Sequence, residues 1–218
     1  PDYVFIPEGT SNQFIEVARA TVAKNYPGKL SSNSDYTSMI NDRQLHRVNG
    51  LLEDAREKGA EVIALADAED ARSAGKLAPH LVLNVSEDMQ IMKEEIFGPL
   101  LPVKTYRGLD EVLEYINSHE RPLAFYYFDD DRGRTEMMLK KTISGGVSVN
   151  TVMLHVLQEN LPFGGVGNSG LGHYHAEEGF QTFSKMRPIF YQSKINGSAL
   201  LRPPYGKLTR LLLKLTLR

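Results

Sequence analysis

The chain has no cysteine and no tryptophan among its 218 residues. The absence of cysteine excludes disulfide bonds, zinc sites built from thiolates and a catalytic thiol within this chain. Neither charge is in large excess, because the formal net charge is only −2 at pH 7. No basic surface for nucleic acid is therefore predicted. The leucine-rich stretch at residues 205–218 is too short to cross a bilayer.

What the sequence does contain is a regular alternation of short β-type runs and amphipathic helical patterns. Strands are predicted at residues 3–6, 61–66, 81–85, 101–106, 123–128 and 147–149, and helices at 14–22, 42–58, 109–116 and 129–139. This alternation predicts an α/β fold with an open, mostly parallel sheet and helices on both faces. Thr10 and Gln13 predict a capping box for the first helix. Pro79 predicts that its strand starts at a sheet edge, and the unbroken apolar run at 123–128 predicts a strand buried on both faces.

The first stretch with chemical content is EEIFGPLLPV, residues 94–103. Gly98-Pro99 forces a turn that can present Glu95 and Phe97 on the same side. A carboxylate accepts hydrogen bonds from the vicinal hydroxyls of a ribose, and an aromatic ring beside it can pack on a nicotinamide. The alternative is an acidic surface turn with Phe97 in the core. Glu94 and Glu95 do not form an acid/base pair, because neighbours in an extended segment point to opposite faces.

The second stretch runs from Gly146 to Phe183 and contains LPFGGVGNSGLGHYHAEEGFQTF. Asn150 ends a predicted strand, where α/β folds place their sites. The candidate pocket residues are Asn150, Met153, Val156, Phe163 and His175. The alternative is core packing for the apolar residues and a solvated turn for His173 and His175, whose spacing also fits no metal site. The glycines at 165–170 match G-x-G-x-x-G, but no buried strand precedes them, so we interpret them as a tight supporting loop.

Both stretches resemble the catalytic domain of the aldehyde dehydrogenase family, in particular the branch of fatty, aromatic and coniferyl aldehyde dehydrogenases. The resemblance implies that Glu95 binds the nicotinamide ribose of NAD or NADP and that Phe97 contacts the ring. It also places the nucleophilic cysteine and the general-base glutamate upstream of Pro1, so no catalytic residue is expected in this chain. The resemblance implies that this chain is a fragment of an enzyme that oxidises an aldehyde to the acid through a cysteine thiohemiacetal. The fragment by itself is expected to be inactive. The alternative is a non-catalytic α/β interaction domain built on the same scaffold.

The chain divides by pattern into three parts. Residues 1–184 are predicted to form the catalytic domain, and residues 185–193 a strand that bridges subunits of a homodimer, as the resemblance implies. Residues 194–218 are predicted to form a linker and an amphipathic helix. Its basic face comprises Lys207, Arg210, Lys214 and Arg218, and its apolar face comprises Leu208, Leu211, Leu212 and Leu215. That helix can pack on protein or make a peripheral contact with a membrane. No secretory signal pattern is found, and we expect a cytoplasmic protein.

Overall fold

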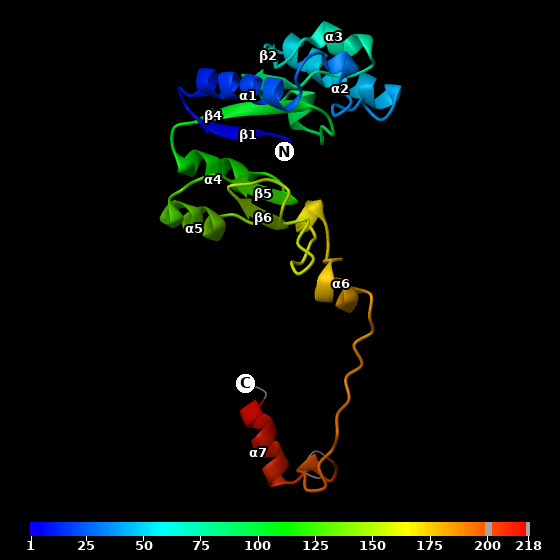
Figure 1. Ribbon diagram of the computed structural model, residues 1–218. Coiled ribbons are helices and arrows are strands. Elements are labelled where there is room, and N and C mark those ends of the chain that lie inside the picture. Colours follow the sequence, from blue (N-terminus) through cyan, green and yellow to red (C-terminus); the bar gives the residue numbers. More distant parts are fainter. Residues whose placement is uncertain (199–201, 217–218) are drawn as a thin grey trace.

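The computed structural model describes residues 1–198 and 202–216 (Figure 1). A four-stranded α/β layer comes first, a smaller α/β unit follows it, and an extended arm leads to the last helix (Figure 1). The elements, in chain order, are β1 (Val4–Pro7), α1 (Ser11–Asn25), η1 (Leu30–Ser32), α2 (Asp42–Glu57), β2 (Glu61–Ala64), α3 (Ala68–Ser73), β3 (His80–Leu83), η2 (Gln90–Met92), β4 (Leu100–Tyr106), α4 (Leu109–Ser118), β5 (Ala124–Tyr127), α5 (Arg132–Lys141), β6 (Gly146–Val149), η3 (Gly167–Ser169), α6 (Ala176–Thr182) and α7 (Lys207–Thr216).

The strands confirm the predicted α/β class with mostly parallel pairing. The larger sheet has the order β1-β4-β3-β2, in which β4 runs parallel to β1 and β3, and β2 runs antiparallel to β3. β5 and β6 form a separate parallel pair. The described strands therefore divide between two sheets where the sequence predicted one.

Helices cover both faces of the larger sheet, as predicted. Leu81 and Leu83 of β3 pack in one apolar cluster with Phe14 of α1. Val82, which points the other way, packs in a second cluster with Val48 of α2. All four residues of β3 are buried, which is typical of a strand in the middle of a parallel α/β sheet.

Three local predictions were wrong. The hydroxyl of Thr10 does not cap α1, because it donates to the Pro7 carbonyl at 2.7 Å and so stabilises the preceding turn. Pro79 does not mark an edge, because β3 lies between β4 and β2. Proline is tolerated there because it precedes the ladder, and its carbonyl accepts from the Leu65 N–H at 2.9 Å. β5 is only half-buried, because its sheet has just two strands.

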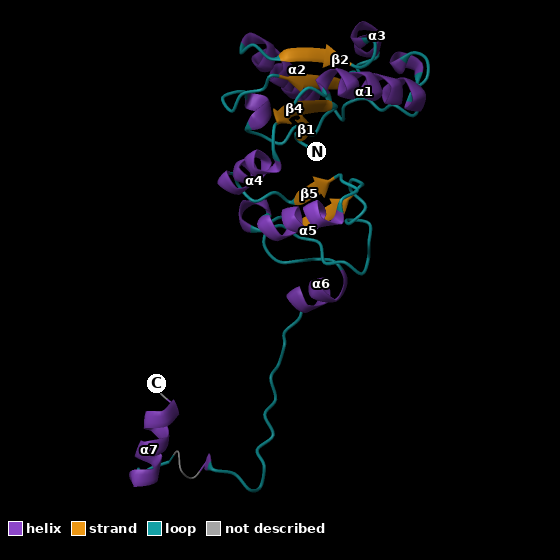
Figure 2. Ribbon diagram, turned by 90° about the vertical axis from the view of Figure 1, so that its left-hand side faces the viewer, coloured by secondary structure: helices purple, strands orange, loops and turns teal. Residues whose placement is uncertain are grey.

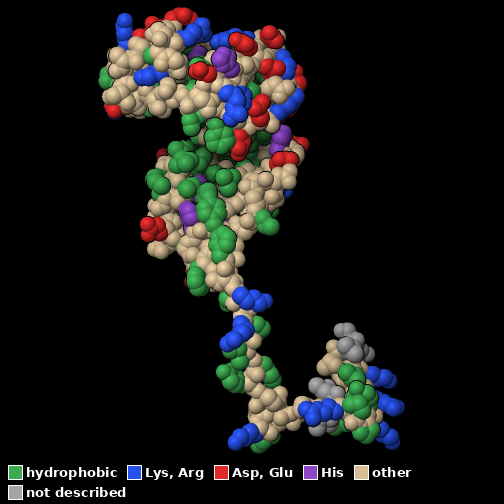
Figure 3. Space-filling model, turned by 90° about the vertical axis from the view of Figure 1, so that its right-hand side faces the viewer, with side chains coloured by type: hydrophobic (Ala, Val, Ile, Leu, Met, Phe, Trp, Pro, Cys, Tyr) green, Lys and Arg blue, Asp and Glu red, His purple; other side chains and the backbone are tan. Residues whose placement is uncertain are grey.

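The segment after α6 runs as an extended arm away from the rest of the chain and carries α7 at its far end (Figures 1 and 2). Residues 185–193, predicted to bridge two subunits as a strand, form no strand in this single chain. Figure 3 shows basic side chains along one side of α7 and apolar ones along another. Arg218, part of the predicted basic face, lies outside the described residues. Among the helices that the structure describes, none is long and apolar enough to cross a membrane.

Candidate functional site

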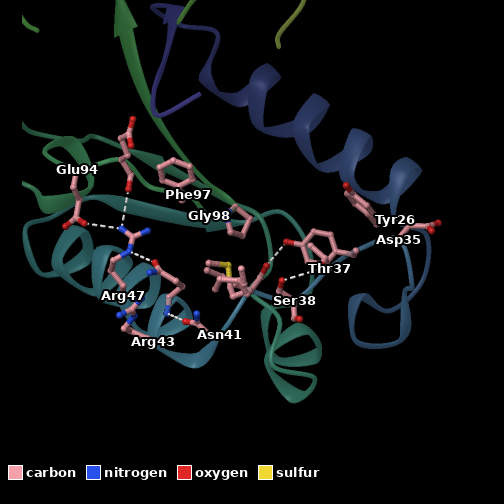
Figure 4. Close-up of a pocket in the computed structure, with 17 residues that line it drawn as sticks. Tyr26, Asp35, Thr37, Ser38, Asn41, Arg43, Arg47, Glu94, Phe97 and Gly98 are labelled. Carbon is pink, nitrogen blue, oxygen red and sulfur yellow. Dashed lines mark hydrogen bonds and ion pairs between the residues drawn. The ribbon is translucent and has the colours of Figure 1, made fainter. Parts of the chain in front are cut away.

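A cavity of about 970 Å³ lies between the 94–99 turn, the loop at residues 35–41 and the first turns of α2 (Figure 4). Its lining includes Glu95 and Phe97, together with Arg43 and Arg47 of α2. Ligand pockets in proteins are typically about 300–1,000 Å³, so this one has room for a substantial part of a dinucleotide. Both residues selected from the first motif therefore line one cavity.

Phe97 does not belong to the core, which removes the alternative that the sequence left open for it. Its side chain is 78% exposed, whereas its neighbour Ile96 is 1% exposed and fills the apolar cluster under α2. Its φ is +44°, in the left-handed region that bulky residues rarely adopt. Such a conformation costs about 1–3 kcal/mol and persists only where the surroundings enforce it. The turn thus holds an aromatic ring open to the cavity.

The two adjacent carboxylates have different surroundings. Glu94 forms an ion pair with Arg47 at 3.0 Å. Within residues 1–198 and 202–216, no group donates a hydrogen bond to the Glu95 carboxylate. Its oxygens are therefore available to accept hydrogen bonds from a ligand, and the two glutamates do not share one task.

Arg47 and Gly98 fix the turn. Gly98 was expected to form the turn with Pro99, but the part played by Arg47 was not predicted. The Arg47 guanidinium donates to the Glu95 carbonyl at 3.3 Å and to the Ile96 carbonyl. A methyl group at Gly98 would lie 2.8 Å from Cγ1 of the fully buried Val48. The turn therefore rests directly on α2. These contacts join residues about 50 positions apart, so no local sequence signal announces them.

Asn150 has a scaffold role and its amide does not point freely into a pocket. Its Oδ1 accepts from the Asp129 N–H at 2.9 Å, and its Nδ2 donates to the Asp129 carbonyl at 3.1 Å. Arg134 also donates to the Asp129 carboxylate through Nε and Nη2 at 2.7 and 2.6 Å. The bonds from Arg134 hold the pKa of the Asp129 carboxyl below its ordinary value. Asn150 therefore ties the ends of β5 and β6 together.

Three of the other four residues from the second motif lie along a row of rings. Tyr126 donates its hydroxyl to the Met153 sulfur at 3.3 Å, and its ring centroid lies 6.0 Å from that of His155. Phe163 lies 6.2 Å from His155 and 5.2 Å from His175, measured between ring centroids. This aromatic row (Tyr126, His155, Phe163, His175) was not predicted, since Tyr126 and His155 lie outside the set of candidate pocket residues.

His155 lies at the centre of the row and is almost fully buried. Its Nδ1 shares a hydrogen bond of 2.9 Å with the Ser148 hydroxyl, and burial lowers the pKa of its imidazole. Val156 lies beside the row, where its N–H donates to the Met153 carbonyl at 3.0 Å in the turn after β6.

The cavity of Figure 4 is lined only by residues between 26 and 99. The two motifs therefore do not share one cavity.

The glycine-rich loop is packed backbone against backbone, which confirms that residues 165–170 form a tight loop. A methyl group on Gly164 would collide with the Gly172 carbonyl, and one on Gly165 with the Ser169 carbonyl. No side chain other than hydrogen fits at either position. In the part of the chain that the structure describes, no three histidine, aspartate or glutamate residues gather as a metal site would require.

Comparison with known proteins gives four informative matches. The model of the aldehyde dehydrogenase family matches residues 1–189. A protein of Pseudomonas aeruginosa named as a probable coniferyl aldehyde dehydrogenase is 48% identical over 220 residues, which cover 100% of this chain and 45% of that protein. A dimeric NADP-preferring aldehyde dehydrogenase of Canis lupus familiaris is 36% identical and covers 96% of this chain and 46% of its own length. The solved substrate-bound Staphylococcus aureus AldH has a TM-score of 0.83 at 30% identity and covers 99% of this chain and 46% of its own.

Proposed function

Because the chain belongs to the aldehyde dehydrogenase family, we propose that it supplies the nicotinamide-binding turn and part of the aldehyde site of an NAD(P)-dependent aldehyde dehydrogenase. It spans less than half the length of the relatives described above, so the activity proposed is that of the whole enzyme. Without a cysteine the chain alone has no thiolate to attack an aldehyde, and we expect it to be inactive. The non-catalytic alternative is not favoured, because the relatives matched across the chain are named as enzymes.

The observation that carries the proposal is the exposed ring of Phe97 beside the unpaired carboxylate of Glu95 in one cavity. When bound, the nicotinamide cofactor supplies the hydride acceptor. Glu95 would then accept hydrogen bonds from the ribose hydroxyls, and Phe97 would pack against the nicotinamide ring. Hydride transfer is steeply sensitive to the position of the reacting atoms, so this turn controls its rate.

Glu95→Gln in the complete enzyme tests this assignment, because the amide keeps the shape but loses the charge and one acceptor. We expect a slower hydride-transfer step in single-turnover measurements of NAD(P)H formation, with unchanged labelling of the catalytic thiol. Glu94→Gln is the matched control, since it removes the adjacent carboxylate, which is paired with Arg47. An unchanged hydride-transfer rate in Glu95→Gln would overturn the role.

For the substrate, we propose an aromatic aldehyde of the coniferyl type. The support is the name of the Pseudomonas aeruginosa relative together with the aromatic row, whose rings can stack with a substrate ring. The kcat/KM of the complete enzyme should then be higher for coniferyl aldehyde than for a straight-chain aldehyde of similar length. A preference for the straight chain would count against an aromatic substrate.

We also propose that the complete enzyme is a homodimer whose subunits exchange their arms. Three facts support this. The leucines of α7 are exposed, with Leu208 and Leu211 both 55% accessible. The segment after Glu178 contains eight of the 25 Lys and Arg residues and no Asp or Glu. The part of the chain up to Glu178 contains the other 17 Lys and Arg residues and all 27 Asp and Glu residues, so it is acidic and its charge is complementary to that of the arm. The Canis relative is named as dimeric.

Light scattering of the complete enzyme tests this proposal. We expect the mass of two chains, and the mass of one chain after Leu211→Glu, which places a charge in the apolar face of α7. Lys214→Gln is the control on the polar face of the same helix. If the wild type is monomeric and sediments with anionic lipid vesicles through α7, the helix binds a membrane surface and the dimer proposal fails.

A further inference from the structure

Arg47 of α2 donates hydrogen bonds into the 94–99 turn. Its Nη1 donates to the Glu94 carboxylate at 3.0 Å and to the Glu95 carbonyl at 3.3 Å, and its Nη2 donates to the Ile96 carbonyl. Its Nε donates to the Gln44 side chain at 2.8 Å, which fixes the plane of the guanidinium from within α2. One side chain thus contacts three consecutive residues of the turn (Figure 4).

These contacts surround Glu95 without touching its carboxylate. Arg47 donates hydrogen bonds to the carbonyls of Glu95 and Ile96, and it forms an ion pair with Glu94. The Ile96 N–H is held independently by the Asp2 carboxylate at 3.0 Å. The backbone around Glu95 is therefore fixed on both sides, while its side chain keeps its acceptors free for a ligand.

We propose that Arg47 is a positioning residue for hydride transfer: it orients Glu95 and Phe97 by holding the turn between them, and it also prevents Glu94 from competing as an acceptor. The inference rests on the function proposed above. The strained φ of Phe97 requires a restraint of this kind, because a left-handed aromatic residue relaxes when its neighbours release it. Arginine suits the task because its planar fork serves several acceptors at once, which a lysine ammonium does not.

Arg43 provides a matched control. It lies four residues before Arg47 on α2 and lines the same cavity. In the described part of the chain its guanidinium makes no hydrogen bond and no ion pair. Arg43→Met and Arg47→Met therefore remove the same charge from the same cavity, but only the second releases the turn.

Hydrogen exchange of the chain measures the restraint directly and needs no cofactor. We expect the Ile96 amide, which donates to the Asp2 carboxylate, to exchange roughly ten-fold faster in Arg47→Met, the effect of losing at least one hydrogen bond from a charged donor, and to be unchanged in Arg43→Met. Arg47→Lys should fall between Arg47→Met and the wild type. Equal exchange in the two methionine variants would overturn the inference, whether or not the enzyme proves to be an aldehyde dehydrogenase.

Kinetics of the complete enzyme then separate positioning from general stability. We expect Arg47→Ala to slow hydride transfer about ten- to hundred-fold, with unchanged thiol labelling and unchanged KM for the aldehyde. Free guanidinium ion, well below denaturing concentrations, should restore part of that rate in Arg47→Ala and none in Arg43→Ala. A wild-type rate of hydride transfer in Arg47→Ala overturns the inference and leaves the proposed function intact. If the complete wild-type enzyme does not oxidise aldehydes, the proposed function is overturned instead.

Discussion

Gly98 is the point at which the 94–99 turn touches α2, and its replacement by alanine is the sharpest test of that contact. An alanine Cβ would lie 2.8 Å from Cγ1 and 3.1 Å from Cγ2 of Val48. Val48 is fully buried and β-branched, so its methyl groups cannot swing aside. Either the core under α2 or the turn itself must move.

The size of the effect follows from two opposing contributions. Forcing an extra methyl group into a packed core costs about 1–3 kcal/mol. Replacing glycine by alanine returns about 0.4–1 kcal/mol, because it restricts the unfolded chain. The net loss is about 1–2 kcal/mol, which lowers the Tm of a chain of this length by roughly 2–8 °C.

Thermal unfolding of the chain followed by circular dichroism measures this loss. Gly50→Ala is the matched control, because Gly50 lies within α2 and nothing is within 4 Å of an added methyl group. That change should raise stability by about 0.5–1 kcal/mol. A Gly98→Ala chain as stable as the wild type would refute the close approach of the turn to α2.

Two further predictions concern pH. Bonds from Arg134 and the Asp131 N–H lower the pKa of Asp129, so its stabilisation is fully present above the ordinary aspartate value and is lost as pH falls through its folded pKa. The Tm difference between wild type and Asp129→Asn should therefore shrink below about pH 4. Asp130→Asn is the control, because its carboxylate makes no hydrogen bond or ion pair in the described residues. Burial lowers the pKa of His80, so the folded chain resists its protonation and loses stability as pH falls below about 6.5. His80→Gln should flatten the decline in Tm between pH 7.5 and pH 5.5, roughly the range in which an unfolded histidine titrates, and an unaltered slope would contradict the assignment.

The elements that the sequence predicted well are those in which a long period and its end signals agree. α2 is the best case, because apolar residues recur at helical spacing, Asn41 caps the start and Gly59 takes a φ of +91° just beyond the end. The predicted cap at Thr10 was wrong because a hydroxyl beside a turn can bond either to the helix that follows or to the turn that precedes it. The Thr10 hydroxyl bonds to the Pro7 carbonyl of the preceding turn. A sequence motif alone does not rank such partners.

Local sequence identified some residues of the candidate site and missed those whose partners are distant along the chain. Glu95 and Phe97 could be selected from sequence, because a Gly-Pro turn fixes two side chains only a few bonds apart. The Asn150 amide is already bonded to Asp129, which follows a separate strand, and local spacing does not reveal that the amide will be used there. Arg47 was missed for the same reason, since its acceptors lie 47 to 49 residues away.

Backbone strain offers an argument independent of motif or relative. In residues 1–198 and 202–216, the non-glycine residues with positive φ are Asn84, Phe97, Asn150, Met153 and Ala176. Three of these five had already been selected for their chemistry. Asparagine adopts this conformation at little cost, but a phenylalanine does not, and selection for stability alone would place glycine or asparagine at position 97. Because the ring at this position is mostly exposed, it gains little from packing to offset that cost. A ring kept under strain and open to a cavity is better explained by a bound ligand than by the core.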